Sequence, residues 1–298
     1  GAALGGFAAI VWNDVGASYI QVVKAADDQP VLFQALSTAG NAPVEGVKCI
    51  ALSDRFLLIG ANTTTSNVSI ARFTPASDTA VVQLTQNVFT LAANVVTTAA
   101  CKVAGSDEVM VAVSTLTPAI KLKRFTNAGV DSGVTYTVSS AVAATFMAVE
   151  ASSSANQVNI ALNVGGECKV HSFNLTTGAE IGVGPFAAFA GDTPAQMSLV
   201  RVSATVVRVV CSVTSGTTPS IKSNLYTVST NTFAGVVVAV TDAQLTTTAA
   251  LVTATGQTIF GMCVGSAALG KSPNLLGSFN ALSTQDNKIE ICKDFEVA

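Results

Sequence analysis

A short signature returns along the whole chain: a large apolar residue, followed by a small hydroxyl or amide residue, ends a strand-like stretch. The steps between successive copies are 37, 52, 48, 53 and 53 residues. A period near 50 residues predicts one supersecondary unit per repeat, because each unit can bury its apolar face against the next. The large residues of the copies are Leu36, Phe73, Phe125, Phe173, Tyr226 and Phe279.

Short stretches rich in Val, Ile and Thr fill each repeat, and Ser, Asp, Asn and Gly separate them. In the third repeat they cover 100–104, 109–114, 120–125 and 134–138, and no stretch of the chain sustains a helical period. Proline cannot donate a hydrogen bond within a sheet, so it favours the start of a strand. It stands six or seven residues before the signature at Pro30, Pro118, Pro219 and Pro273. The chain is therefore predicted to be all-β, a six-bladed β-propeller of mostly four-stranded antiparallel blades.

We predict a single domain over residues 1–298, because no linker-like composition interrupts the repeats. The first repeat is short, with strands expected at 7–12, 19–25 and 31–36 and no outermost fourth strand. A strand expected at 289–292 completes either the sixth blade or the first, and its spacing from Phe279 favours the sixth. The repeats are approximately 1–46, 47–96, 97–145, 146–194, 195–246 and 247–298.

Composition argues against several function classes. Hydrophobic residues make up 49% and charged residues 11%, the opposite of the bias in disordered chains. A net charge of −3 indicates no nucleic-acid partner, since duplex binding needs a basic surface. The longest apolar run, 234–240, is far shorter than the ~20 residues of a spanning helix, so no membrane insertion is expected. A start at Gly1 rather than Met leads us to expect a cut or processed chain.

Four charged residues fall at comparable places on the first strands of their repeats: Lys48, Lys102, Glu150 and Arg201. The first strands of a propeller surround its central channel, so these side chains are predicted near the channel mouth as a polar ring that binds a ligand. Ion pairing between blades is the alternative, with Glu150 neutralising Lys102 or Arg201. The cost of leaving charges unpaired favours that alternative.

The cysteines and the single histidine indicate no metal centre. Cys49 and Cys101 are 52 residues apart, at like positions of consecutive repeats, so each is expected as a free thiol inside its own blade. Cys168 and His171 have the spacing of half a zinc site, but strand residues three apart point to opposite faces. We predict a surface histidine, no metal and no cofactor.

The stretch Gly265–Ser272 matches the phosphate-binding loop pattern at every fixed position. Such a loop needs a helix directly after it, whose N-terminus completes the anion site. Residues 273–279 are short, interrupted by glycine and aligned with the third strands of other repeats. A hairpin loop with a chance match is therefore favoured over nucleotide binding.

The recurring signature, with an aromatic residue or Leu before Thr, Asn or Ser, is combined with a low-charge composition rich in Ala, Val, Thr and Ser. In these features the chain resembles the short-motif propeller domains of bacteriophage tail, nozzle and fibre proteins, and of some bacterial surface proteins. The resemblance implies a structural or receptor-contacting role and transfers no site residue.

The function predicted on these grounds is a non-catalytic structural or interaction module of a virion or extracellular surface, within a larger assembly. It would bind a protein or a glycan through the loops between second and third strands. The alternative is a carbohydrate-active enzyme, a glycosidase or lyase, that uses an acid pair near the channel. The loops are expected at 63–67, 165–167, 214–218 and 265–272.

Overall fold

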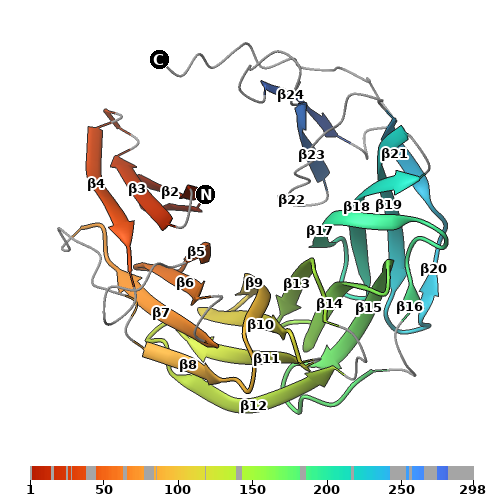
Figure 1. Ribbon diagram of the computed structural model, residues 1–298, viewed down its shortest axis with the longest axis horizontal. Helices are drawn as coiled ribbons and strands as arrows, with labels where there is room; N and C mark the ends of the chain where they lie inside the picture. The colour runs from red at the N-terminus through yellow and green to blue at the C-terminus, as the bar shows by residue number, and fades with distance from the viewer. Residues whose placement is uncertain are drawn as a thin grey trace. The chain divides into compact units, whose positions relative to one another are not determined.

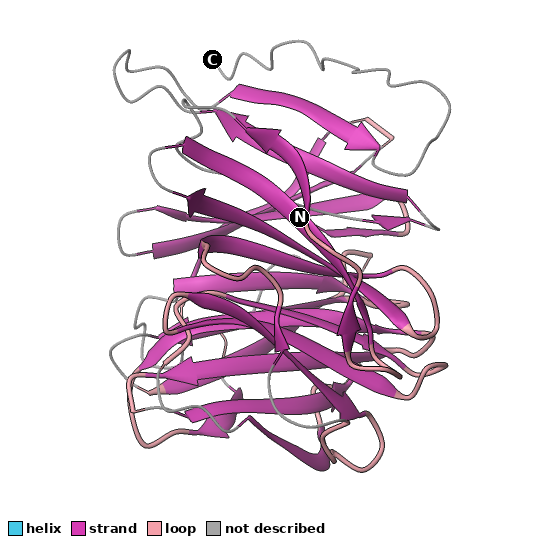
Figure 2. Ribbon diagram, turned by 90° about the vertical axis from the view of Figure 1, so that its right-hand side faces the viewer, coloured by secondary structure: helices cyan, strands magenta, loops and turns pink. Residues whose placement is uncertain are grey.

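The computed structural model consists of β-strands connected by turns and loops (Figure 2). The part of the chain that it describes contains no helix, and hence none long and apolar enough to cross a membrane. The described residues are 2–14, 17–24, 26–27, 29–37, 45–62, 66–76, 84, 86–117, 119–138, 143–181, 186–215, 218–241, 253–254, 257–264 and 274–280.

Three antiparallel meanders of four strands follow one another along the first half of the chain (Figure 1). Within each meander the strands pair in sequence order, as expected for segments joined by short turns. The strands are β1 (Ala2–Leu4), β2 (Phe7–Asp14), β3 (Ala17–Lys24), β4 (Gln29–Leu36), β5 (Glu45–Ala51), β6 (Phe56–Asn62), β7 (Asn67–Phe73), β8 (Gln86–Thr90), β9 (Val95–Ala104), β10 (Glu108–Thr115), β11 (Ala119–Thr126) and β12 (Asp131–Val138).

The second half repeats the arrangement. Strands β13 to β16 form a fourth meander, and β13 pairs in parallel with β9 at Ala151↔Val103, giving the order β12-β11-β10-β9-β13-β14-β15-β16. In the next sheet β21 pairs with β19 beside β20. The strands are β13 (Met147–Ser152), β14 (Gln157–Val164), β15 (Glu167–Asn174), β16 (Phe186–Ala187), β17 (Thr193–Arg201), β18 (Val206–Ser215), β19 (Thr218–Thr227), β20 (Thr232–Phe233), β21 (Val237–Thr241), β22 (Thr253–Ala254), β23 (Gln257–Val264) and β24 (Asn274–Asn280).

The chain divides into two compact units. Unit 1 comprises residues 1–145, 149–158 and 173–179, and unit 2 comprises 146–148, 159–172 and 180–298. In unit 1 strand β6 is buried on both faces. Phe56 and Leu58 pack into a core shared with the first meander, whereas Leu57 and Ile59 pack into a core shared with the third. Meanders in unit 1 therefore stack face to face, because successive strand residues point to opposite faces.

Unit 2 holds a third core between its parts of the fourth meander and the sheet of β17 to β20. Phe189 and Cys168 contribute from one side, and Val207, Val209 and Tyr226 from the other. Each large aliphatic or aromatic side chain buried in such a core stabilises the fold by roughly 1.5–3 kcal/mol relative to exposure.

The recurring signature has a clear structural meaning. Phe73, Phe125, Phe173, Tyr226 and Phe279 each lie at or next to the end of the third strand of their meander. The first four are completely or almost completely buried. The signature therefore marks the point at which a core side chain is followed by a polar turn.

The prediction for the first repeat was wrong in one respect. It does have four strands, because Ala2–Leu4 pairs with β2 as an additional strand at the opposite edge from β4. Leu36 consequently ends the fourth strand of its meander rather than the third. A two-residue turn connects β1 and β2, and Gly5 and Gly6 provide the positive φ angles of 53° and 83° that it requires. This Gly-Gly pair between apolar residues was the overlooked signal. The strand expected at 289–292 lies outside the described residues.

Candidate functional site

Three of the four predicted ring residues lie on successive first strands in unit 1. Lys48 is on β5, Lys102 on β9 and Glu150 on β13. Strand β5 lies beside β9, and β9 pairs with β13. Glu150 is buried, whereas Lys48 and Lys102 keep exposed surface. Surrounding protein atoms lower the pKa of the Lys48 ammonium by desolvation although the residue remains open to water. Arg201 ends β17 in unit 2.

Two of these cations have partners close to them in sequence. Lys102 Nζ lies 3.6 Å from Asp107 Oδ1, in the turn that follows its own strand. The Arg201 guanidinium donates to the carbonyl oxygens of Ser203 and Ala204 at 3.5 and 2.9 Å. Both cations are thus held by the turn after their strand.

Asp107 connects three turns of unit 1. Its carboxylate accepts hydrogen bonds from Ser53 N at 2.7 Å, Ser53 Oγ at 2.6 Å and Asn127 Nδ2 at 3.0 Å. Ser53 lies in the β5–β6 turn, Asp107 in the β9–β10 turn and Asn127 in the β11–β12 turn. Partial burial by itself would raise the pKa of the Asp107 carboxyl, but the bonds from Ser53 and Asn127 and the charge of Lys102 outweigh it and lower the pKa. The carboxylate is therefore a fixed, ionised link between neighbouring meanders.

The next turn along the chain is attached in the same manner. Ser153 in the β13–β14 turn donates from its backbone N and from Oγ to the carbonyl oxygen of Ala104, at 2.9 and 3.0 Å. The turn after a first strand is thus hydrogen-bonded to the neighbouring meander in two places. One connects the second and third meanders, and the other connects the third and fourth, both within unit 1.

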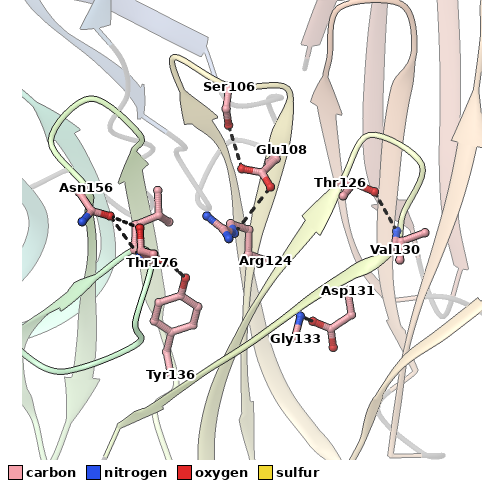
Figure 3. A network of polar contacts seen from close by, with 11 residues as sticks. Ser106, Glu108, Arg124, Thr126, Val130, Asp131, Gly133, Tyr136, Asn156 and Thr176 are labelled. Carbon is pink, nitrogen blue, oxygen red and sulfur yellow. Dashed lines mark hydrogen bonds and ion pairs between the residues drawn. The ribbon is translucent and has the colours of Figure 1, made fainter.

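A polar cluster lies beside these turns (Figure 3). Arg124 Nε is 3.7 Å from Glu108 Oε1, and Ser106 Oγ donates to Glu108 Oε2 at 3.2 Å. The buried Tyr136 hydroxyl donates to the carbonyl oxygen of Leu175, and its ring packs edge-on against Phe173 with centroids 6.1 Å apart. Burial raises the pKa of Tyr136, so the phenol stays protonated and remains a donor.

The loop after β15 is held from the β13–β14 turn in this same region. Asn156 Oδ1 accepts hydrogen bonds from Thr176 N at 3.1 Å and Thr176 Oγ1 at 2.7 Å (Figure 3). Asn156 has a positive φ of 51°, a backbone conformation that Asn tolerates better than most residues. The cluster combines a cation, a carboxylate and several hydroxyl and amide groups, a set suited to hydrogen-bonded recognition.

The prediction of a surface histidine was wrong. His171 is buried at 4% exposure, and its Nδ1 lies 2.8 Å from Glu180 Oε1. The alternation of polar and apolar residues along β15 suggested one open face, but His171, Ser172 and Phe173 are all buried there. Within the described residues no group of three His, Cys, Asp or Glu side chains is placed to hold a metal ion.

Cys49, Cys101, Cys168 and Cys211 are free thiols, as predicted for the cysteines of this chain. Burial raises the pKa of the Cys49 thiol to about 12. Burial, reinforced by the charge of Glu150, raises that of Cys101 as well. Both thiols therefore stay protonated at neutral pH and pack as small apolar groups.

The phosphate-loop match at Gly265–Ser272 lies outside the described residues. Its flanks are described: β23 precedes it and β24 follows, paired antiparallel from Ile259↔Asn280 to Val264↔Asn274. The next described element after the match is therefore a strand, whereas a phosphate-binding loop needs a helix there.

Comparison with known proteins identifies the fold. No family model and no curated protein matches the sequence. Prolyl oligopeptidase B from Galerina marginata, in a mutant form bound to a 35mer hydrolysis and macrocyclization substrate, is similar with a TM-score of 0.52 and 14% identity over 96% of this chain. The apo form of the same protein is similar with a TM-score of 0.51 and 15% identity over 96% of this chain. TolB from Acinetobacter baumannii has a TM-score of 0.49 and 11% identity, and the match covers 92% of this chain and 61% of TolB.

The two prolyl oligopeptidase B structures contain a β-propeller. The fold is propeller-like. The chain covers 39% and 40% of the two prolyl oligopeptidase chains, so it spans less than half of their length.

Sequence reasoning placed the four charged residues on the first strands of their repeats, where the structure has them, but missed the links between turns. Ser53 and Asp107 are 54 positions apart. The Ser and Asp residues between strands were interpreted only as separators, although Ser53-Asp54 and Ser106-Asp107 repeat the same pair. Their recurrence one repeat apart was the available signal. Which carboxylate would accept from which serine depends on how the meanders stack.

Proposed function

We propose that this chain is a six-bladed propeller that serves as a non-catalytic interaction module of a virion or extracellular surface. Residues 1–298 would form a single domain within a larger assembly and would bind a protein or glycan surface through one loop face. The main support is the Asp107 link, which fastens turns of two successive meanders to one carboxylate. Turns fastened to a packed β-scaffold present their side chains with little conformational freedom, as a recognition surface requires.

The inner-strand charges are the binding residues of this proposal: Lys48, Lys102, Glu150 and Arg201. Lys48 and Lys102 keep exposed surface on neighbouring strands of unit 1. A lysine ammonium can donate three hydrogen bonds to glycan hydroxyls, carboxylates or peptide carbonyls. The low-charge composition that resembles phage tail and surface propellers supports the same assignment.

The test is a glycan array together with binding to intact bacterial cells, using the purified chain and variants. Lys48→Ala and Lys102→Ala should each weaken binding by about tenfold, the effect of losing one charge-assisted hydrogen bond. Lys121→Ala is the matched control, because Lys121 is exposed on β11 rather than on a first strand. Unchanged binding in both inner-strand variants would contradict the assignment.

The same glycans are then incubated with the protein and analysed for products. Binding without product supports an interaction module. Time-dependent release of saccharides that disappears in Glu150→Gln would instead support the carbohydrate-active enzyme.

A further inference from the structure

Arg208 is a buried cation on β18 in unit 2. It lies directly opposite Val200 on β17 and Leu225 on β19. Cys211, which belongs to the core shared with the fourth meander, is three residues further along the same strand. Because strand residues alternate between faces, Arg208 points to the face opposite that core. Only 5% of its surface is exposed.

The guanidinium has too few acceptors for its burial. Among the residues that the structure describes, its Nε has no hydrogen-bond partner, and an Nη atom reaches Ser223 Oγ only at 3.5 Å. No ion pair joins it to a carboxylate of the described chain. The nearby pair of Asp192 and Lys222 is on the other face, since Lys222 lies opposite Cys211. Desolvation lowers the pKa of Arg208, but an arginine stays charged at physiological pH.

Two serines flank this cation on its own face of the sheet. Ser198 on β17 and Ser223 on β19 both lie opposite Val210, which follows Arg208 by two residues on β18 and faces the same side of the sheet. The guanidinium thus has an unused Nε donor, and the one acceptor printed for it, Ser223 Oγ, is at the long distance of 3.5 Å. Guanidinium groups pair with carboxylates and phosphates through two parallel N–H donors.

We propose that Arg208, with Ser223 and Ser198, forms an oxyanion-binding site that takes the carboxylate or phosphate group of a ligand. A buried cation without a counter-charge is strongly unfavourable, and a bound oxyanion would supply both the charge and the missing acceptors. The site is independent of the interaction function proposed above, because none of its residues belongs to the inner-strand set.

The experiment measures the melting temperature of the full chain in sodium phosphate and in sodium acetate, each against sodium chloride at equal ionic strength. A ligand that binds only the folded state should raise the melting temperature in a saturable manner, by about 2 °C or more at high occupancy. Phosphate acting alone would assign a tetrahedral oxyanion, and acetate acting as well would include carboxylates. No saturable rise with either anion would overturn the proposal.

Variants locate the effect. Arg208→Met should abolish the anion-dependent rise, and Ser223→Ala, which keeps the charge, should reduce it. Arg72→Met is the control, because Arg72 is exposed on β7 and should leave the rise unchanged. An equal rise in Arg208→Met and the unmodified chain would overturn the proposal.

The melting temperature in chloride alone gives a second readout. Arg208→Met should melt at or above the unmodified protein there, because it removes an uncompensated buried charge while keeping apolar volume. A strongly lowered melting temperature in chloride would show that the chain itself supplies the counter-charge, and this too would overturn the proposal.

Discussion

Gly178 shows how a single residue permits a close approach between a loop and a strand. It follows β15 with a φ of +74°, and a Cβ added there would stand 2.3 Å from the backbone carbonyl oxygen of Thr135 on β12. Both residues belong to unit 1. The site therefore needs glycine for two reasons, backbone conformation and space.

Gly178→Ala should lower the free energy of unfolding by about 2–4 kcal/mol, because it adds a backbone clash to the strain of a positive φ. Gly191→Ala is the matched control: its φ is +80° but its Cβ would have open space, so only the conformational cost of about 1 kcal/mol applies. Urea denaturation of both variants is the measurement. Equal losses would contradict the role of the Thr135 contact.

The partly buried thiols of Cys49 and Cys101 make the stability of the fold depend on pH in the alkaline range. Each pKa is raised in the folded chain, whereas an unfolded thiol titrates near 8.5. Above that pH the unfolded state binds fewer protons than the folded state, so the free energy of unfolding falls as pH rises. The stabilisation from each thiol is fully present below the pKa of the unfolded thiol. It is lost as the pH rises towards the pKa of the folded thiol.

Chemical denaturation at pH 7.5, 9 and 10 should show this decline, and Cys49→Ala and Cys101→Ala should each make it less steep. Either variant also loses some packing at every pH, but a constant loss does not change the slope. A slope identical to that of the unmodified chain would show that these thiols do not titrate on unfolding.

Among the structural elements, turns do more than reverse the chain. The turns at Ser53, Asp107 and Asn127 share one carboxylate, and the turn at Ser153 is tied to Ala104. Adjacent meanders in unit 1 are therefore joined by directional bonds as well as by apolar packing. Such bonds restrict one meander from sliding along the next.

Asp107→Asn tests this link. The variant should lose about 1 kcal/mol at neutral pH, a modest value because the carboxylate is partly exposed and solvent screens it. The lowered pKa means that the stabilisation is present above the unfolded pKa near 3.9 and is lost as pH falls through the folded value. The difference in unfolding free energy between the variant and the unmodified chain should thus shrink below about pH 4. If this difference in unfolding free energy did not change with pH, the result would contradict the role of the ionised Asp107 carboxylate.

At the scale of the whole molecule, burial of both faces of a strand distinguishes stacked meanders from a two-layer sandwich. In β6, Phe56 and Leu58 enter one core while Leu57 and Ile59 enter another. A sheet in a two-layer sandwich would bury only one of these sets. This double burial also explains why the chain is so apolar and so poor in charge.

We predict from the single-domain assignment that the chain is compact in solution. A folded domain of 298 residues should have a radius of gyration of about 19 Å, measured by small-angle scattering. Two units separated by a mobile connection would give a clearly larger value and would contradict the assignment.

Much of the fold could be predicted from local patterns. The positions of Phe125, Phe173 and Tyr226 identified third strands, and alternation with β-branched residues identified the all-β class. The first meander was misread because β1 has three residues, too few for a periodic pattern. The first-strand positions of the four charged residues were predicted, but the partner of Lys102 was not, because ion pairing depends on the path of a turn.

By itself, the sequence determined strand positions, turn positions and the repeat of buried aromatic residues, since these follow from the alternation of side chains and from the backbone preferences of a few neighbouring residues. The tertiary structure alone decided that Asp107 accepts from Ser53, that His171 is buried and that Arg208 Nε has no hydrogen-bond partner among the described residues. These properties arise between segments far apart in the sequence. They depend on which faces meet, and no local pattern encodes that.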